Sequence, residues 1–210
     1  MPTDYYLDAF NSAHKAMQSC WAEGIYLPEV FPKFFKLNSQ IILRLSRWVT
    51  SFINLASGLS KDEFPMQINK VELLIALHAD IDKFLQHMPK VYETIFKCIP
   101  KEKQNCNNLT ETLQKSLKDL QEIMQSQQKT TREALIKLIT AESGTENVRQ
   151  VADLPRLYRK TNRDVPTRCS GYVEQMIKPL KAFGEQNSKD LGEEVVEEVL
   201  SSIASKITTE

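Results

Sequence analysis

Apolar residues return at helical spacing along most of this chain, and no stretch alternates as a β-strand would. The clearest case runs from Leu27-Pro28 to about Leu55, where aromatic and aliphatic side chains cover a wide arc. A helix with so wide an apolar arc is expected at the centre of a helical assembly rather than at its edge. The pattern predicts an all-α fold, either an antiparallel helical bundle or a short helical rod.

Composition agrees with a helical fold and limits the possible partners. Only 6 of the 210 residues are glycine and 26% are charged, which favours helices over a turn-rich β fold. The chain is long enough to bury a core as one large domain or two small ones. The formal net charge of +0 gives no general attraction to nucleic acid or to an anionic membrane. Any such binding would therefore need a local basic patch.

The sequence predicts a single domain with an internal linker. Residues 1–56 are expected to form an N-terminal helical pair, residues 57–69 a linker, and residues 70–210 a helical bundle that continues the same domain. No glycine or proline stop signal precedes Glu210, so we expect the natural domain to continue and the bundle to be truncated there.

Local signals predict where helices begin and end. Thr3 or Asp4 is placed to cap a first helix, which Gly24 is expected to end. The segment Asn69-Lys-Val-Glu72 resembles a capping box at the start of a later helix. Three interruptions of the apolar pattern are predicted: a break or kink at Met88-Pro89, a polar gap at Gln125–Gln128, and a turn at Gly184–Ser188.

Residues that could carry chemistry are dispersed along the chain. His14 lies on an apolar stripe and is expected to be structural, because no second ligand is near it in the sequence; His78 and His87 also lack neighbouring ligands. No phosphate-binding glycine loop and no nucleophile-with-base motif occurs. We therefore expect no enzyme, no catalytic or metal site and no cofactor. Four cysteines are expected to be free thiols: Cys20, Cys98, Cys106 and Cys169.

The most distinctive segment lies between two prolines near the C-terminal third of the chain. The first proline suits the opening turn of a helix and the second ends it, while three apolar side chains share one face. Such a helix would be held at a fixed corner of the bundle. The predicted structural corner comprises Leu154, Pro155, Leu157, Tyr158 and Pro166.

Basic residues surround the same corner and form the candidate partner-binding cluster. They have a structural explanation, since late basic residues complement a helix dipole and can pair with Asp153 and Asp164. They also have a functional explanation, which is an acidic partner such as a protein helix or an anionic membrane surface. Nucleic acid has less support, because few aromatic residues interleave the cluster. The basic cluster comprises Arg156, Arg159, Lys160, Arg163 and Arg168.

Two blocks of sequence carry a family resemblance. Residues 154–167, followed by Tyr172-Val and Lys178-Pro-Leu180, resemble the C-terminal region of subunit 2 of the conserved oligomeric Golgi complex. A second block near the N-terminus resembles the same family in the same order. It comprises Tyr6-Leu-Asp8, Cys20-Trp21, Tyr26-Leu-Pro28 and Gln40-Ile-Ile-Leu-Arg44.

The resemblance implies a function that the residue patterns alone do not. It implies a non-catalytic subunit of a Golgi vesicle-tethering complex, similar in fold to other multisubunit tethers, acting in intra-Golgi retrograde transport through protein–protein contacts. The implied partners are other subunits of the complex, with SNAREs, Rab proteins or golgins, at the cytoplasmic face of the Golgi membrane and in the cytosol. The alternative is a helical module that binds anionic lipid or nucleic acid through Arg156–Arg168, and steep salt dependence would distinguish it.

Overall fold

The computed structural model describes residues 5–58, 69–100, 107–143 and 171–209. These residues form six α-helices and one short 3-10 helix, and no β-strand occurs among them, so the predicted all-α class is confirmed. The elements are α1 (Asp8–Cys20), η1 (Pro28–Val30), α2 (Phe31–Gly58), α3 (Lys70–Lys97), α4 (Asn107–Ser143), α7 (Gly171–Leu191) and α8 (Glu193–Thr209).

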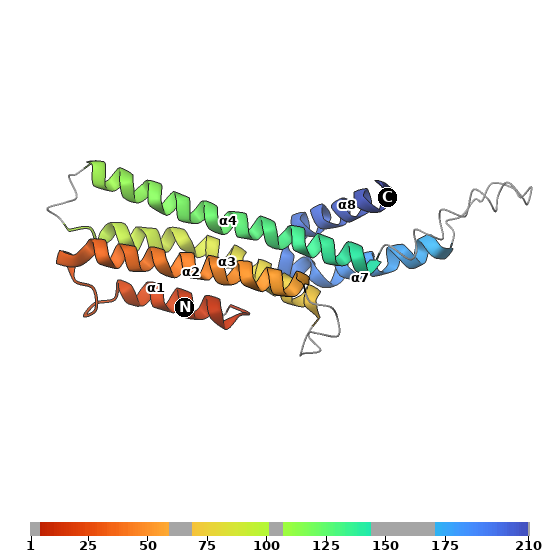
Figure 1. The fold of residues 1–210 in the computed structure, drawn as a ribbon, viewed down its shortest axis with the longest axis horizontal. Coiled ribbons are helices and arrows are strands. Elements are labelled where there is room, and N and C mark those ends of the chain that lie inside the picture. Colours follow the sequence, from red (N-terminus) through yellow and green to blue (C-terminus); the bar gives the residue numbers. More distant parts are fainter. Residues whose placement is uncertain (1–4, 59–68, 101–106, 144–170, 210) are drawn as a thin grey trace, which may run out of the picture. The chain divides into compact units, whose positions relative to one another are not determined.

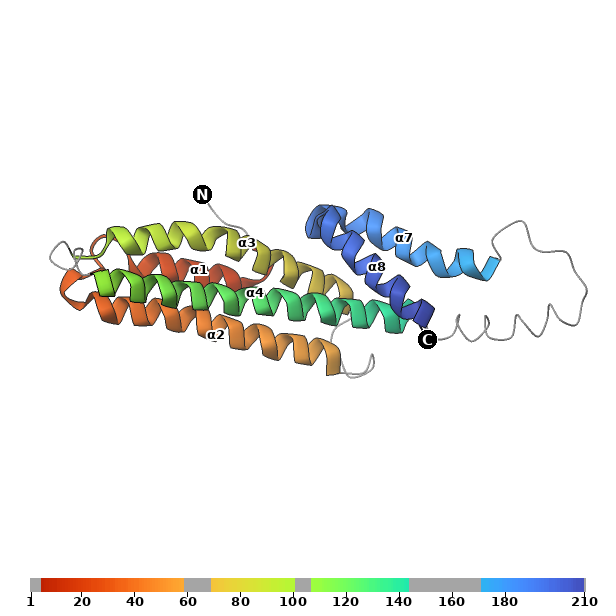
Figure 2. The same cartoon turned by 90° about the horizontal axis from the view of Figure 1, so that it is seen from above.

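The chain divides into two compact units, Met1–Thr131 and Arg132–Glu210, and the boundary falls inside α4. In the first unit, α1, α2, α3 and the first part of α4 lie side by side and alternate in direction (Figures 1 and 2). This is an up-and-down antiparallel bundle, as the sequence predicted. The linker predicted at residues 57–69 stays a prediction, because most of it lies outside the described residues.

Aromatic side chains from three helices meet in the core of the first unit. The Phe10 ring of α1 lies 5.9 Å from that of Phe84 on α3 and 6.2 Å from that of Trp48 on α2, both edge to face. Edge-to-face contacts of this kind add to the free energy gained by burial alone. Helix α2 contacts both α1 and α3, and its Thr50 hydroxyl donates to Gln127 of α4. The wide apolar arc of α2 therefore does place it at the centre.

The start of α1 is held by a residue from another helix. Leu7, at the N-cap position, makes no side-chain cap, and the predicted caps Thr3 and Asp4 lie outside the described residues. Instead the carboxylate of Asp80 on α3 accepts hydrogen bonds from the backbone N–H groups of Tyr6 at 2.8 Å and Leu7 at 2.7 Å. Asp80 thus fixes the chain as it enters α1, and this contact ties α1 to α3.

Helix α1 is shorter than predicted, and α3 opens as predicted. The prediction that Gly24 ends the first helix is wrong, because α1 already ends at Cys20; Gly24 lies in the following turn, with φ of 82°. The Asn69 side chain accepts a hydrogen bond from the Val71 N–H at 3.0 Å and donates to Glu72 at 3.3 Å. This arrangement caps α3 with the residues of the predicted capping box.

The predicted break at Met88-Pro89 does not occur, since α3 continues through Pro89 to Lys97. A proline inside a helix removes one hydrogen bond and costs about 3 kcal/mol. Pro89 is exposed, however, while Phe84, Met88 and Val91 are buried on the opposite side of the helix. Burial of each such side chain contributes about 1.5–3 kcal/mol, so packing outweighs the effect of the proline.

The polar residues Gln125–Gln128, which interrupt the apolar seam as the sequence indicated, lie inside α4, and the helix is continuous through them. Two of these glutamines have partners on neighbouring helices of the first unit. The Thr50 hydroxyl donates to Gln127 Oε1 at 3.2 Å, and Gln128 Nε2 donates to the Asp82 carboxylate at 3.1 Å. Polar side chains in this seam are thus satisfied by α2 and α3.

In the second unit, α7 and α8 pack against each other and are joined at Gly192, whose φ of 82° favours glycine. The turn predicted at Gly184–Ser188 is wrong, because these residues lie inside α7. A Cβ atom at Gly184 would lie 3.4 Å from Leu200 Cδ1, so the glycine serves close helix packing rather than a turn. The Arg132 guanidinium pairs with the Glu198 carboxylate in the same unit.

No helix in the described ranges is long and apolar enough to cross a bilayer.

Candidate functional site

Three polar rings meet between α1 and α3, in the first unit. The Tyr5 hydroxyl lies 3.0 Å from His87 Nδ1 and 3.4 Å from His14 Nδ1, and the two imidazole rings are 5.3 Å apart. His14 is only 6% exposed, in agreement with its place on an apolar stripe of the sequence. No second histidine lies near His14 in the sequence, yet the fold brings His87 beside it across 73 residues of chain.

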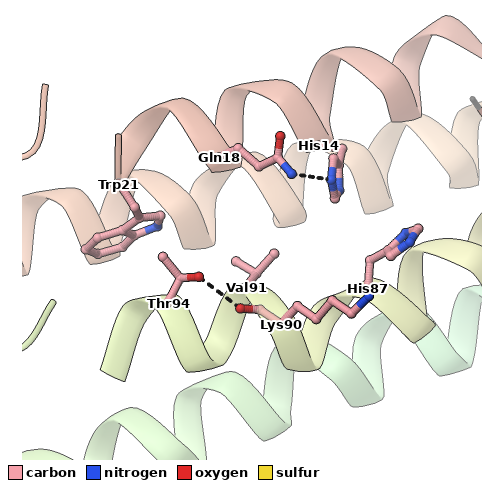
Figure 3. A pocket seen from close by; sticks show the side chains of 7 residues that line it. All are labelled: His14, Gln18, Trp21, His87, Lys90, Val91 and Thr94. Atoms are coloured by element: carbon pink, nitrogen blue, oxygen red, sulfur yellow. Dashed lines mark hydrogen bonds between the residues drawn. The ribbon is translucent and has the colours of Figure 1, made fainter. Parts of the chain in front are cut away.

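The hydrogen-bond partners determine which nitrogen of each imidazole carries the proton. The Gln18 amide donates to His14 Nε2 at 2.8 Å, so the neutral His14 ring carries its proton on Nδ1 (Figure 3). His14 Nδ1–H then donates to the Tyr5 hydroxyl oxygen, and the Tyr5 hydroxyl donates to His87 Nδ1. The neutral His87 ring therefore carries its proton on Nε2. The result is an ordered chain of donors that runs from α1 to α3.

The surroundings keep this cluster uncharged at neutral pH. Burial lowers the pKa of His14, and the neighbouring His87 lowers it further. Burial also lowers the pKa of His87, with smaller contributions from Lys90 and Lys83. Burial, with the nearby charge of Asp80, raises the pKa of the Tyr5 phenol far above its usual value. Three neutral side chains can hydrogen-bond to one another in this buried position without the free-energy cost of burying a charge.

Asp80, which is 1% exposed, is a buried carboxylate next to the cluster. Burial raises the pKa of this carboxyl, while the hydrogen bonds from Tyr6 and Leu7 and the nearby Lys83 lower it again. The Lys83 ammonium lies 5.3 Å from the centre of the Tyr5 ring. Asp80 and Lys83 thus surround the Tyr5 ring with one charge of each sign.

A groove of about 380 Å³ opens beside the cluster, between α1 and α3 (Figure 3). Its floor is made of buried side chains, Trp21, Val91 and His14, and its rim of more exposed ones. None of the seven described residues that line it is acidic. We call this feature the α1–α3 groove; its lining residues are His14, Gln18, Trp21, His87, Lys90, Val91 and Thr94.

The site residues predicted from sequence lie outside the part of the chain that the structure describes. The structural corner and the basic cluster both fall within residues 144–170, outside the described residues, and so stay predictions. Cys20 and Cys98 are free thiols whose pKa is raised by burial, whereas Cys106 and Cys169 also lie outside the described part. Within the described residues, no three His, Cys, Asp or Glu side chains are grouped as metal ligands would be.

Comparison with known families identifies the type of chain. The family model described as "COG complex component, COG2, C-terminal" matches residues 2–210. The chain belongs to this family. The resemblance predicted from the two sequence blocks is thereby confirmed.

Members of this COG2 family from distant organisms match almost the whole chain. The conserved oligomeric Golgi complex subunit 2 of Drosophila melanogaster is 51% identical over 207 residues, which are 98% of this chain and 28% of that protein. The proteins of the same name from Homo sapiens and Arabidopsis thaliana are 22% and 24% identical, over 97% and 92% of this chain. The chain spans 26–31% of the length of these relatives. No solved structure matches it significantly.

Proposed function

We propose that this chain is a non-catalytic part of a Golgi vesicle-tethering complex, acting in intra-Golgi retrograde transport through protein–protein contacts. The observation that carries the proposal is the COG2 family match over residues 2–210. The 51% identity to a Drosophila subunit of the conserved oligomeric Golgi complex supports it. The up-and-down bundle also supports it, because packed helices offer long side-chain surfaces for other proteins.

The partners follow from the same proposal. Other subunits of the complex are the primary ones, and SNAREs, Rab proteins or golgins are further ones. We place the chain at the cytoplasmic face of the Golgi membrane, associated peripherally, and in the cytosol. Contacts with proteins rather than nucleic acid agree with its formal net charge of +0.

A chimaera tests this function in a living cell. In Drosophila cells depleted of their own subunit 2, the matching segment of the Drosophila protein is replaced by this 210-residue chain. We expect the chimaera to co-purify with the other subunits and to restore the distribution of Golgi-resident glycosyltransferases. The control is the same chimaera with Phe84→Asp, which puts a charge into the core of the first unit.

The chimaera experiment has two outcomes that would contradict the account. A chimaera that accumulates as well as the native protein, yet neither co-purifies with the complex nor restores the enzymes, would rule out the proposed function. A chimaera that behaves like the Phe84→Asp control would contradict the fold instead.

We propose that the basic cluster Arg156, Arg159, Lys160, Arg163 and Arg168 binds a partner, which is one of the two explanations that the sequence leaves open. Five cations within thirteen residues suit an acidic protein surface, and the alternative is an anionic lipid or nucleic acid. Binding driven by phosphate groups should weaken steeply as salt is raised, whereas apolar contacts between helices should not. Co-purification of the chimaera at low and high salt therefore distinguishes binding driven by phosphate groups from binding through apolar helix contacts.

A further inference from the structure

One hydrogen-bond donor in the α1–α3 groove is left over by the ordered chain of rings. His14 donates its Nδ1 proton to Tyr5, and Tyr5 donates its hydroxyl proton to His87 Nδ1. The Nε2 proton of His87 is not used by any of these hydrogen bonds. No residue in the part of the chain that the structure describes accepts this proton at hydrogen-bond distance. Its direction is fixed, because rotation of the His87 ring would break the hydrogen bond to Tyr5.

A cation lies next to this donor. Lys90 lines the same groove, one turn further along α3, and its side chain extends along the helix toward His87 (Figure 3). Lys90 makes no ion pair with any described residue, and its charge is close enough to lower the pKa of His87. An ammonium and an imidazole N–H at one end of a groove without acidic lining favour a single carboxylate.

The other end of the groove is apolar. Trp21 and Val91 form its floor there, and the Trp21 ring lies 5.4 Å from that of Tyr26 in the turn after α1. The neighbours of Tyr26 in this turn, Ile25 and Leu27, are 53% and 56% exposed. Aromatic and aliphatic side chains around a small depression are typical of an anchor site for a bulky apolar side chain.

We propose that the α1–α3 groove binds a short extended segment of a partner protein, in which an aspartate or glutamate lies next to a bulky apolar residue. The carboxylate accepts from His87 Nε2 and pairs with Lys90, while the apolar side chain packs on Trp21 and Val91. From His87 to Thr94 the groove follows α3 for roughly 10 Å, at 1.5 Å per residue. That length holds about three residues of extended peptide. The chemistry of the bound segment is inferred from the residues of the groove alone, whereas the biological role of the groove rests on the proposed tethering function.

Peptide selection on the full chain tests this site. A display library of random peptides is selected on the 210-residue protein, and the recovered peptides are titrated against three proteins: the native chain, Lys90→Gln and Lys97→Gln. We expect an acidic residue beside leucine, phenylalanine or tryptophan in the selected peptides. Lys90→Gln should weaken them by about tenfold or more, because it removes a charge-assisted contact. Lys97→Gln, an exposed lysine of α3 outside the groove lining, should leave affinity unchanged.

Other occupants are outcomes of the same test. Recovery of no peptide, of peptides without an acidic residue, or of peptides equally weakened by both variants would overturn the proposal. Inorganic phosphate that displaces the peptides at low millimolar concentration, or Lys90-dependent binding to vesicles of phosphatidylcholine and phosphatidylserine, would assign the groove to phosphate groups instead.

The result is separable from the test of function. If the chimaera restores the Golgi enzymes but no acidic peptide is selected, the groove proposal is wrong and the tethering function stands. If acidic peptides are selected and the chimaera fails, the groove binds peptides and the tethering function is wrong.

Discussion

Replacing Asp80 with alanine should loosen the start of α1 and destabilise the first unit. The Asp80 carboxylate is 1% exposed and accepts two backbone hydrogen bonds, from Tyr6 and Leu7. Alanine removes the carboxylate oxygens that accept from these two N–H groups. It also releases the side-chain link from α3 to Tyr6 and Leu7, the two residues that precede α1.

The expected magnitude follows from these two bonds. A hydrogen bond to a charged group contributes about 1.5–3 kcal/mol, so two give roughly 3–6 kcal/mol before offsets. Burial of the carboxylate, visible in its raised pKa, offsets part of this, and exposed Tyr6 regains a partner from water. We therefore expect Asp80→Ala to lower the free energy of unfolding by about 2–3 kcal/mol. Asp80→Asn, which keeps one acceptor oxygen, should cost about half as much.

Urea unfolding followed by tryptophan fluorescence measures this change. The two tryptophans of the chain, Trp21 and Trp48, both lie in the first unit, so the signal reports that unit alone. The matched control is Glu93→Ala, which removes an exposed carboxylate from the same helix and should change stability by no more than about 0.5 kcal/mol. Equal unfolding midpoints for Asp80→Ala and Glu93→Ala would refute the role given to Asp80.

Three further predictions address other parts of the chain. The pKa values of His14 and His87 are lowered by folding, so the unfolded chain binds more protons as the pH falls through the ordinary histidine value of 6.5. The free energy of unfolding should therefore decrease on acidification through that value, and less steeply in a His14→Gln/His87→Gln double variant; equal slopes in urea titrations at several pH values would contradict this. Pro89→Ala should raise the free energy of unfolding by about 1–3 kcal/mol, because it restores a helix hydrogen bond at an exposed position. An unchanged or lower midpoint of urea unfolding would argue against a continuous α3. In the predicted corner, Leu157→Ala should cost roughly 2–5 kcal/mol and Arg159→Glu less than about 1 kcal/mol, as followed by circular dichroism; the reverse order would reject the corner.

The helices were predictable from sequence, whereas their continuity was not. Apolar spacing repeats every turn, so it identifies a helix without knowledge of its neighbours. The local signal at Pro89 predicted a break, but burial of Met88 and its apolar neighbours keeps α3 helical. The polar residues Gln125–Gln128 interrupt the apolar seam without interrupting α4, where Gln127 accepts a hydrogen bond from α2 and Gln128 donates one to α3. Gly184 likewise reflects close packing against α8, which no local pattern of α7 contains.

The α1–α3 groove depends on residues that are distant in sequence. Asp80 reaches Leu7 across 73 residues and His87 reaches Tyr5 across 82, and sequence spacing cannot give the register between two helices. One signal was present. Asp80 lies on the same helical face as apolar Leu77 and Phe84, and a carboxylate on a buried face needs a partner. The identity of that partner required the three-dimensional structure.

The proposed binding of a carboxylate in the α1–α3 groove depends most directly on which nitrogen carries the proton in His14 and in His87. Two-dimensional NMR spectra that correlate imidazole nitrogens with ring carbon-bound protons identify the tautomer of each histidine at neutral pH. The ordered hydrogen bonds predict a proton on Nδ1 of His14 and on Nε2 of His87. A proton on Nδ1 of His87 would contradict the account, because His87 would then present an acceptor rather than a donor to the carboxylate, which would be left with Lys90 alone.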